Sequence, residues 1–303
     1  MAILDSSHRP WHGRLEQAMV PLTAPSGGGV DVDESEPSQG RGEASFDFTG
    51  RRVLVTGGGS GVGLATARAF SAAGADVVVI EVNEAAAAVT RDTVPGVQVD
   101  AVDVTDATGL RELVSARGDF DVVVNNAMIC GDDDFLSATP EQMRREIDVN
   151  LMGPLLVSQA VLPGMITRGD GVIVNISSIN AALHLGNEAY SAAKSGLQSL
   201  TRSIATEFGP DGVRCNTVAL GTVETPAWTQ RRAADPGVFA RLSGWYPLRR
   251  VGTVADAAAA VMFLASDAAR WVTGTVLTVD GGFTAGNLRM SADIRGHDDQ
   301  AAP

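Results

Sequence analysis

Short apolar runs alternate with longer, alanine-rich amphipathic stretches over most of the chain. Strands that are apolar on both faces and alternate with helices are typical of a parallel sheet covered on either side. The apolar runs predict strands at 52–56, 76–80, 97–102, 121–125, 172–177, 213–218 and 275–279. The stretches between them predict helices at 61–73, 84–91, 107–116, 140–150, 154–167, 188–208 and 254–266.

Right-handed crossovers between such strands produce a doubly wound parallel sheet, so we predict an α/β fold of the Rossmann type. The alternation is not interrupted by a second pattern, which predicts a single domain at residues 46–285. Residues 1–45 show neither a helical nor a strand period and are expected to form a disordered N-terminal extension. The polar residues 286–303 are expected to form a loose C-terminal tail.

Composition and charge narrow the classes of function. The 303-residue chain is 45% hydrophobic and carries a formal net charge of −13. Such a chain is repelled by phosphate backbones and anionic lipids, which argues against a nucleic-acid or membrane partner. No apolar run reaches the roughly 18 residues of a membrane span, and two cysteines provide no disulfide framework. We therefore expect a cytoplasmic protein that acts on a small molecule.

A glycine-rich turn follows the first predicted strand and precedes an alanine-rich helix. Glycines let the backbone turn tightly and approach a pyrophosphate, and the helix N-terminus offers free N–H groups and the positive end of its dipole. Glycine-rich loops without a ligand also occur, but this strand–turn–helix context is the one that a dinucleotide requires. The candidate cofactor-binding residues of the turn are Gly57, Gly59, Ser60, Gly61, Val62 and Gly63.

Glu81 follows the second predicted strand. A carboxylate at this point can accept hydrogen bonds from both ribose hydroxyls and repels a 2′-phosphate. No arginine follows closely, because the next residues are Val82 and Asn83. The sequence therefore predicts NAD rather than NADP, and the alternative is a solvated carboxylate near a helix start.

Tyr190 and Lys194 are four residues apart on a predicted helix, so their side chains share one face. A phenol with its ordinary pKa of about 10 is a poor base, but a nearby ammonium stabilises the phenolate and lowers that pKa. The pair is therefore a candidate general acid and base, with Ser178 at the end of the preceding strand to bind the substrate oxygen. Taken alone, this spacing is common by chance on helix surfaces.

Several short motifs occur together in one order. They are TGGGSGVG at 56–63, DV at 103–104, NNA at 125–127, Asn150 in DVNLMGP, ISS at 176–178, YSAAK at 190–194 and VDGGF at 279–283. In this combination the chain resembles the short-chain dehydrogenases/reductases over residues 46–285. The resemblance implies hydride transfer between a nicotinamide cofactor and an alcohol or carbonyl group. It also implies a homotetramer, or a homodimer, built on the two long helices near 154–167 and 188–208.

The resemblance also assigns catalytic roles. Tyr190 is the proton donor and acceptor. Lys194 binds the nicotinamide ribose and lowers the pKa of Tyr190. The resemblance places both Tyr190 and Lys194 among the cofactor-binding residues as well. Ser178 orients the substrate oxygen, and Asn150 holds a water that links Lys194 to solvent.

Further cofactor contacts are implied on either side of this centre. Asp103 and Val104 flank the adenine, and Asn126 lies along the adenosine ribose. Val223 and Thr225 lie near the nicotinamide carboxamide.

Three features depart from the family pattern. Met128 follows the NNA motif where the family has glycine, which could crowd the cofactor. Leu220 replaces the proline before the nicotinamide loop, so the loop loses a rigid φ. The family's usual interval between the catalytic serine and tyrosine is one residue longer than that between Ser178 and Tyr190. Counting back from Tyr190 by the usual interval selects Ser177, whereas the position at the strand end selects Ser178. We prefer Ser178, because loops absorb deletions more easily than strands.

The remaining candidates are weaker. His184 precedes Tyr190 in a loop and could contact substrate or face solvent. Cys130 has no base placed near it, so it is expected to pack, and no metal site is predicted. Aromatic residues between 225 and 251 suggest a lid over an apolar or cyclic substrate. Two other functions stay open: a cofactor-binding regulatory or scaffolding protein with little turnover, and a lyase or epimerase on the same fold.

Overall fold

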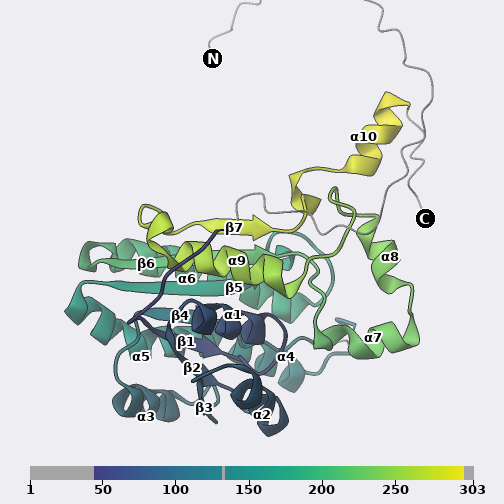
Figure 1. Cartoon of the computed structure of the whole chain (residues 1–303). Helices are drawn as coiled ribbons and strands as arrows, with labels where there is room; N and C mark the ends of the chain where they lie inside the picture. The colour runs from purple at the N-terminus through teal and green to yellow at the C-terminus, as the bar shows by residue number, and fades with distance from the viewer. Residues whose placement is uncertain (1–43, 132–133, 297–303) are drawn as a thin grey trace, which may run out of the picture. The chain divides into compact units, whose positions relative to one another are not determined.

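A single parallel sheet organises the part of the chain that the computed structural model describes, residues 44–131 and 134–296. Its seven strands follow the order β3-β2-β1-β4-β5-β6-β7 (Figure 1). The strands are β1 (Arg52–Thr56), β2 (Asp76–Ile80), β3 (Gln98–Asp100), β4 (Val122–Asn125), β5 (Gly171–Ser178), β6 (Val213–Leu220) and β7 (Val276–Val279). The predicted Rossmann-type α/β fold is confirmed. The predicted extension at 1–45 lies almost entirely outside the described residues.

Helices cover both faces of the sheet, because successive strand residues point to opposite sides. Val53 and Val55 of β1 face a core shared with α1 and α9, whereas Leu54 faces a core shared with α3 and α5. Burying each such side chain stabilises the fold by about 1.5–3 kcal/mol. The α-helices are α1 (Gly61–Ala72), α2 (Glu84–Thr93), α3 (Ala107–Arg117), α4 (Pro140–Ile147), α5 (Gly153–Arg168), α6 (Glu188–Glu207), α7 (Thr229–Ala234), α8 (Val238–Ser243), α9 (Val254–Ala265) and α10 (Leu288–Arg295). The 3₁₀ turns are η2 (Ile179–Ala181), η3 (Gly209–Asp211), η4 (Pro226–Trp228), η5 (Asp267–Ala269) and η6 (Phe283–Ala285).

The two helices predicted at 140–150 and 154–167 form one continuous helical stretch. Between α4 and α5 the backbone forms a π-helical segment, η1 (Asp148–Met152). Pro154 lies in the first turn of α5 and has no N–H to donate, so the hydrogen-bond ladder is rearranged here rather than broken. The stretch Pro140–Arg168 is long and apolar enough to cross a membrane, but half of the relevant window is buried in the fold, so it is weak evidence for a span.

The structure differs from the predicted loose tail at residues 288–295, which form α10. The Asn287 side chain accepts the N–H of Met290 and caps the start of this helix. Gly296 ends it in the left-handed conformation. The two capping residues were the signal in the sequence, but the polar composition of the segment obscured it.

The strand order reverses between β1 and β4, because the chain first builds β2 and β3 on one side of β1 and then returns to the other. Ligands of doubly wound sheets bind at such a point, outside the carboxyl ends of the strands. The segments that follow β1, β2, β4, β5 and β6 therefore meet at one edge of the sheet. Helices α7 and α8 lie beyond this edge (Figure 1).

Candidate active site

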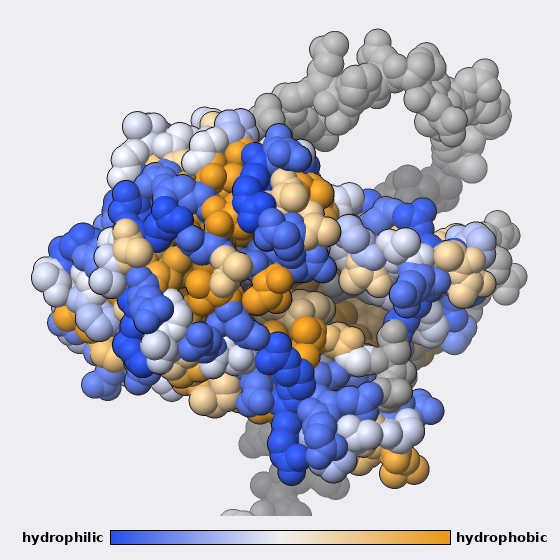
Figure 2. Space-filling view, turned by 90° about the horizontal axis from the view of Figure 1, so that it is seen from below, coloured by the Kyte–Doolittle hydropathy of each residue, from blue (hydrophilic) through white to orange (hydrophobic). Residues whose placement is uncertain are grey.

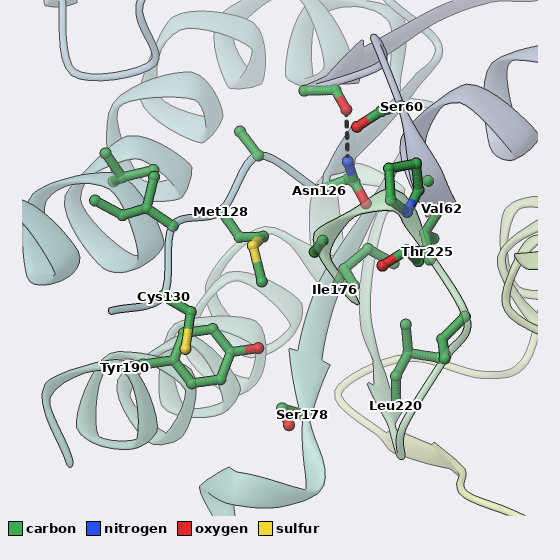
Figure 3. Close-up of a pocket in the computed structure, with 18 of the residues that line it drawn as sticks. Ser60, Val62, Asn126, Met128, Cys130, Ile176, Ser178, Tyr190, Leu220 and Thr225 are labelled. Carbon is green, nitrogen blue, oxygen red and sulfur yellow. Dashed lines mark hydrogen bonds between the residues drawn. The ribbon is translucent and has the colours of Figure 1, made fainter. Parts of the chain in front are cut away.

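A cavity of about 740 Å³ lies at this edge of the sheet. Side chains from several elements converge on it, as Figure 3 shows. A hollow bordered by apolar side chains inside a hydrophilic rim is visible in the surface in Figure 2. The predicted site residues that line the cavity are Gly57, Ser60, Gly61, Val62, Glu81, Asp103, Val104, Asn126, Ser178, Tyr190, Lys194, Val223 and Thr225. Gly59, Gly63 and Asn150 are not part of its lining.

The glycine-rich turn between β1 and α1 has a backbone that glycine adopts most easily. Gly57 and Gly61 have φ angles of 63° and 53°. A Cβ at Gly63 would lie 2.2 Å from the carbonyl oxygen of Gly57, so this position has no room for a side chain. Ser60 precedes α1 without a side-chain capping bond, which leaves first-turn N–H groups to bind an anion. The turn can therefore hold a pyrophosphate.

Glu81 and Asn126 hold this turn from the ends of β2 and β4, the two strands on either side of β1. The Oε2 atom of Glu81 accepts the N–H of Gly59 at 3.1 Å. The Nδ2 atom of Asn126 donates to the carbonyl oxygens of Thr56 and Gly57 at 3.0 and 2.9 Å. Both side chains also line the cavity, so the same residues fix the turn and face the space beside it.

Asp103 borders the cavity beyond β3. Its carboxylate accepts a 2.7 Å hydrogen bond from the Thr105 hydroxyl and forms a 3.1 Å ion pair with Arg145. Burial raises the pKa of Asp103, but the bonds from Thr105 and Arg145 outweigh it and hold that pKa below its ordinary value. The sequence analysis did not select Arg145, because it lies on α4, 42 residues away from Asp103.

Tyr190 and Lys194 lie on one face of α6, as predicted from their spacing. Lys194 is 2% exposed; its Nζ donates to the Ile176 carbonyl at 2.8 Å and lies 5.5 Å from the centroid of the Tyr190 ring. Burial lowers the pKa of Lys194 to about 8. The pKa of Tyr190 is raised above its ordinary value, first by burial and then by the nearby Cys130, while its hydrogen bond with the Ser178 hydroxyl lowers it. This net direction is opposite to the predicted one, because burial is the largest cause.

Asn150 lies within the π-helical segment η1 and is fully buried. Its Nδ2 donates to the carbonyl oxygens of Ile129 and Glu146 at 2.7 and 2.9 Å. Its Oδ1 is buried and has no hydrogen-bond partner among the described residues. Asn150 therefore fixes the loop after β4 and presents one unused acceptor in the interior.

Ser177 and Ser178 point to opposite sides of β5, as neighbouring strand residues do. Ser178 lines the cavity, and its hydroxyl donates to Oδ1 of Asn180 at 3.0 Å. Ser177 is 2% exposed and donates instead to the Lys194 carbonyl at 3.2 Å. Asn180 lies two residues beyond Ser178, in η2, and orients the hydroxyl that forms a hydrogen bond with Tyr190; no motif in the sequence indicated it.

This chain is similar to known proteins in both sequence and structure. A family model described as enoyl-(acyl carrier protein) reductase matches residues 57–284. An oxidoreductase of Schizosaccharomyces pombe is 38% identical over 252 residues, which cover 81% of this chain and 95% of that protein. A short-chain dehydrogenase/reductase from Burkholderia thailandensis has a crystal structure that superposes with a TM-score of 0.79 at 41% identity, covering 82% of this chain and 98% of that one. The chain belongs to the short-chain dehydrogenase/reductase family.

As a short-chain dehydrogenase/reductase, the protein is an oxidoreductase that uses a nicotinamide cofactor. Carbonyl reductase (NADPH) 2 of Sus scrofa is 34% identical over 242 residues, covering 79% of this chain and 99% of that protein. That relative is named for the phosphorylated cofactor, so membership of the family does not decide between NAD and NADP. The turn at residues 57–63, which has no room for a side chain at Gly63, fits the pyrophosphate of either.

The departures from the short-chain dehydrogenase/reductase pattern are accommodated differently. Leu220 ends β6 with 8% exposure, packs against the core and also borders the cavity (Figure 3). Met128 is 46% exposed and lines the cavity, where Figure 3 shows it between Asn126 and Tyr190. Met128 therefore reduces the space beside the cofactor site without closing it.

Residues outside the predicted set complete the surroundings. Asn187 adopts a left-handed backbone (φ 58°) before α6, and its Nδ2 donates to the Gly131 carbonyl at 2.5 Å. Cys130 is exposed and lines the cavity, so it does not pack in the interior as expected. His184 is exposed and outside the cavity lining. Among the described residues, no group of three or more His, Cys, Asp and Glu side chains could hold a metal ion.

Proposed function

We propose that this protein is an NAD(H)-dependent oxidoreductase that transfers a hydride between nicotinamide and an alcohol or ketone. The observation that supports it most is that the hydroxyls of Ser178 and Tyr190 and the glycine-rich turn line one cavity. Bound nicotinamide would accept or donate the hydride. The test is to assay a panel of secondary and cyclic alcohols and ketones by the absorbance of the reduced cofactor. The decisive control is Tyr190→Phe.

The chain's own residues would handle the proton and the orientation. Ser178 donates a hydrogen bond to the substrate oxygen, and Tyr190 moves the hydroxyl proton at that oxygen. The Lys194 ammonium stabilises the Tyr190 phenolate and binds the nicotinamide ribose. The unused Oδ1 of Asn150 supports its proposed role in holding a relay water, because a buried acceptor needs a partner.

The remaining cofactor contacts follow the cavity lining. Asp103 and Val104 would flank the adenine, and Asn126 would lie along the adenosine ribose. Val223 and Thr225 would contact the nicotinamide carboxamide. Glu81, at the end of β2, would accept the ribose hydroxyls and so select NAD over NADP.

Cofactor selection is testable through Glu81. The wild type is expected to bind NADH at least about tenfold more tightly than NADPH, because a carboxylate facing a 2′-phosphate costs about 1.4 kcal/mol or more. Glu81→Gln should reduce this ratio, since the amide no longer repels the phosphate. Paired titrations of both cofactors by fluorescence measure it.

Glu84→Gln provides a matched control for this experiment. Glu84 begins α2 outside the cavity lining and pairs with Arg91 at 2.9 Å on the exposed surface. It should leave the ratio of the two affinities unchanged. Tighter binding of NADPH by the wild type, or equal effects of the two variants, would remove Glu81 from its assigned role.

The choice between the two serines is a second test. Ser178→Ala is expected to lower kcat by about 100-fold, because it removes the hydroxyl that would orient the substrate oxygen. Ser177→Ala removes a buried hydrogen bond to the Lys194 carbonyl and should cost about 1 kcal/mol of stability with only a small change in kcat. Steady-state kinetics and thermal melts distinguish them, and a larger kcat loss for Ser177→Ala would reverse the assignment.

The surroundings of the site suggest the remaining properties. Trp228 and Arg231 bring the segment after β6 to the cavity, which supports a lid over the substrate and a preference for apolar or cyclic molecules.

Apolar side chains are exposed on and beside α5, with Met152 at 41% and Ile166 at 36%. They support a homotetramer, or a homodimer, assembled through α5 and α6. We propose a cytoplasmic enzyme with the domain at 46–285.

A further inference from the structure

The loop between β6 and α7 carries the last predicted cofactor contacts, and its rear side is tied to the rest of the fold by few bonds. Gly221 donates its N–H to the Val279 carbonyl at 3.0 Å. Gly252 donates to the Thr222 carbonyl at 2.8 Å. The Glu224 N–H donates to the Gly252 carbonyl at 2.8 Å. One further bond comes from a side chain: the Thr222 N–H donates to the Tyr246 hydroxyl at 2.8 Å. A tyrosine distant in sequence therefore holds the start of this loop.

The Tyr246 ring is itself held firmly. It is 4% exposed, and its centroid lies 5.4 Å from that of the Phe283 ring. Gly221 leaves room for it, since a Cβ there would lie 3.2 Å from its Cε1, and Gly281 lies against the other side of the ring's edge, where a Cβ would be in ordinary contact at 3.5 Å from its Cδ1. The hydroxyl is thus presented to the loop from a fixed position.

Open space lies behind the loop rather than packed atoms. A cavity of about 270 Å³ is bordered by Thr222 and Tyr246 together with Arg250 and Asp256. Packing contributes little on this side of Thr222, so its position depends on hydrogen bonds: the Gly252 N–H holds its carbonyl and the Tyr246 hydroxyl holds its N–H.

Tyr246 also connects two parts of the site. It lies three residues after α8, in the segment that continues from the cavity-lining residues Trp228 and Arg231, while its hydroxyl contacts the loop whose front side lines the same cavity. We propose that Tyr246 is a positioning residue, which couples the lid segment to the nicotinamide end of the cofactor site. This inference rests on the proposed position of the cofactor. It assigns a role to Tyr246, the second of the chain's two tyrosines, that no local pattern in the sequence indicates.

Tyr246→Phe keeps the ring and removes only the hydroxyl. It is expected to weaken binding of the preferred nicotinamide cofactor by about tenfold, because it leaves the Thr222 N–H without its partner. The kcat at saturating cofactor should change by no more than about twofold, since no group that touches the substrate is altered. Ser71→Ala is the control: it removes a hydroxyl that donates to the Pro95 carbonyl at 2.9 Å, away from the cavity lining, and should leave the cofactor affinity within about twofold of wild type.

Hydrogen–deuterium exchange of the peptide that contains Thr222 tests the contact without relying on a variant. The Thr222 amide should be protected in the wild type and should exchange faster in Tyr246→Phe, while the Gly221 amide is unaffected. An unprotected Thr222 amide in the wild type, or an unchanged cofactor affinity in folded Tyr246→Phe, would overturn the proposal. A wild type that binds neither NADH nor NADPH would instead overturn the proposed function, and the exchange result would still decide on the Tyr246 contact.

Discussion

Replacing Tyr190 by phenylalanine is expected to lower kcat by about 100- to 10,000-fold in both directions of the reaction. The substitution removes one hydroxyl and keeps the ring that lines the cavity beside Cys130 (Figure 3). Cofactor affinity should change little by comparison, because the glycine-rich turn and the strand ends supply most of its contacts. Steady-state kinetics together with a cofactor titration measure the two effects separately.

The pH dependence sharpens this test. Alcohol oxidation needs Tyr190 as a base, and burial raises its pKa, so the phenol stays protonated at neutral pH. The oxidation rate of the wild type should therefore rise with pH up to about 8 and level off above it, where Lys194 loses its charge, whereas the residual rate of Tyr190→Phe should not follow that rise. A variant with wild-type turnover would contradict the oxidoreductase mechanism proposed for this site. Turnover without net change in reduced cofactor would indicate a lyase or epimerase.

Lys194→Met is expected to lower kcat by at least about 100-fold while leaving the protein at least as stable as the wild type at neutral pH. The loss of turnover follows from removing the charge that favours the Tyr190 phenolate. The retained stability follows from the burial of Lys194, because desolvating an ammonium costs free energy that a thioether does not require. The loss of the 2.8 Å bond to the Ile176 carbonyl offsets part of this gain.

The difference in stability between Lys194→Met and the wild type depends on pH. Burial lowers the pKa of Lys194 from 10.5 to about 8. Between these pH values the unfolded chain binds more protons than the folded protein, so the free energy of unfolding of the wild type rises with pH. The advantage of Lys194→Met should be largest below pH 8, at most roughly 3 kcal/mol before the lost hydrogen bond, and should shrink towards pH 10.5.

Thermal melts of both proteins across this range measure that difference. Lys194→Arg is the matched control, because it keeps a charge in the same place. Its difference in melting temperature from the wild type should not shrink as the pH rises. A large drop in the melting temperature of Lys194→Met at pH 7 would show that the ammonium is satisfied in the interior and would contradict the expected cost of burying it.

The sequence by itself determined the class of fold and most of the residues that line the candidate site. Continuous apolar runs such as 52–56 specify buried parallel strands, because only a strand covered on both faces can bury every residue. Local constraints also located the glycine-rich turn, the Tyr190–Lys194 pair and Glu81, since each depends on spacing within one strand, turn or helix. The structure places Ser178 on the cavity side of β5, where the strand register had put it.

The tertiary structure alone decided what depends on contacts between distant segments. Two contacts join residues that no local pattern relates: the ion pair between Arg145 and Asp103, and the hydrogen bond from the Thr222 N–H to the Tyr246 hydroxyl. The direction of the Tyr190 pKa was also beyond the sequence, because spacing shows which charge lies nearby but not how deeply the phenol is buried. Periodicity and spacing are properties of one segment, whereas burial and cross-contacts arise only when the segments pack together.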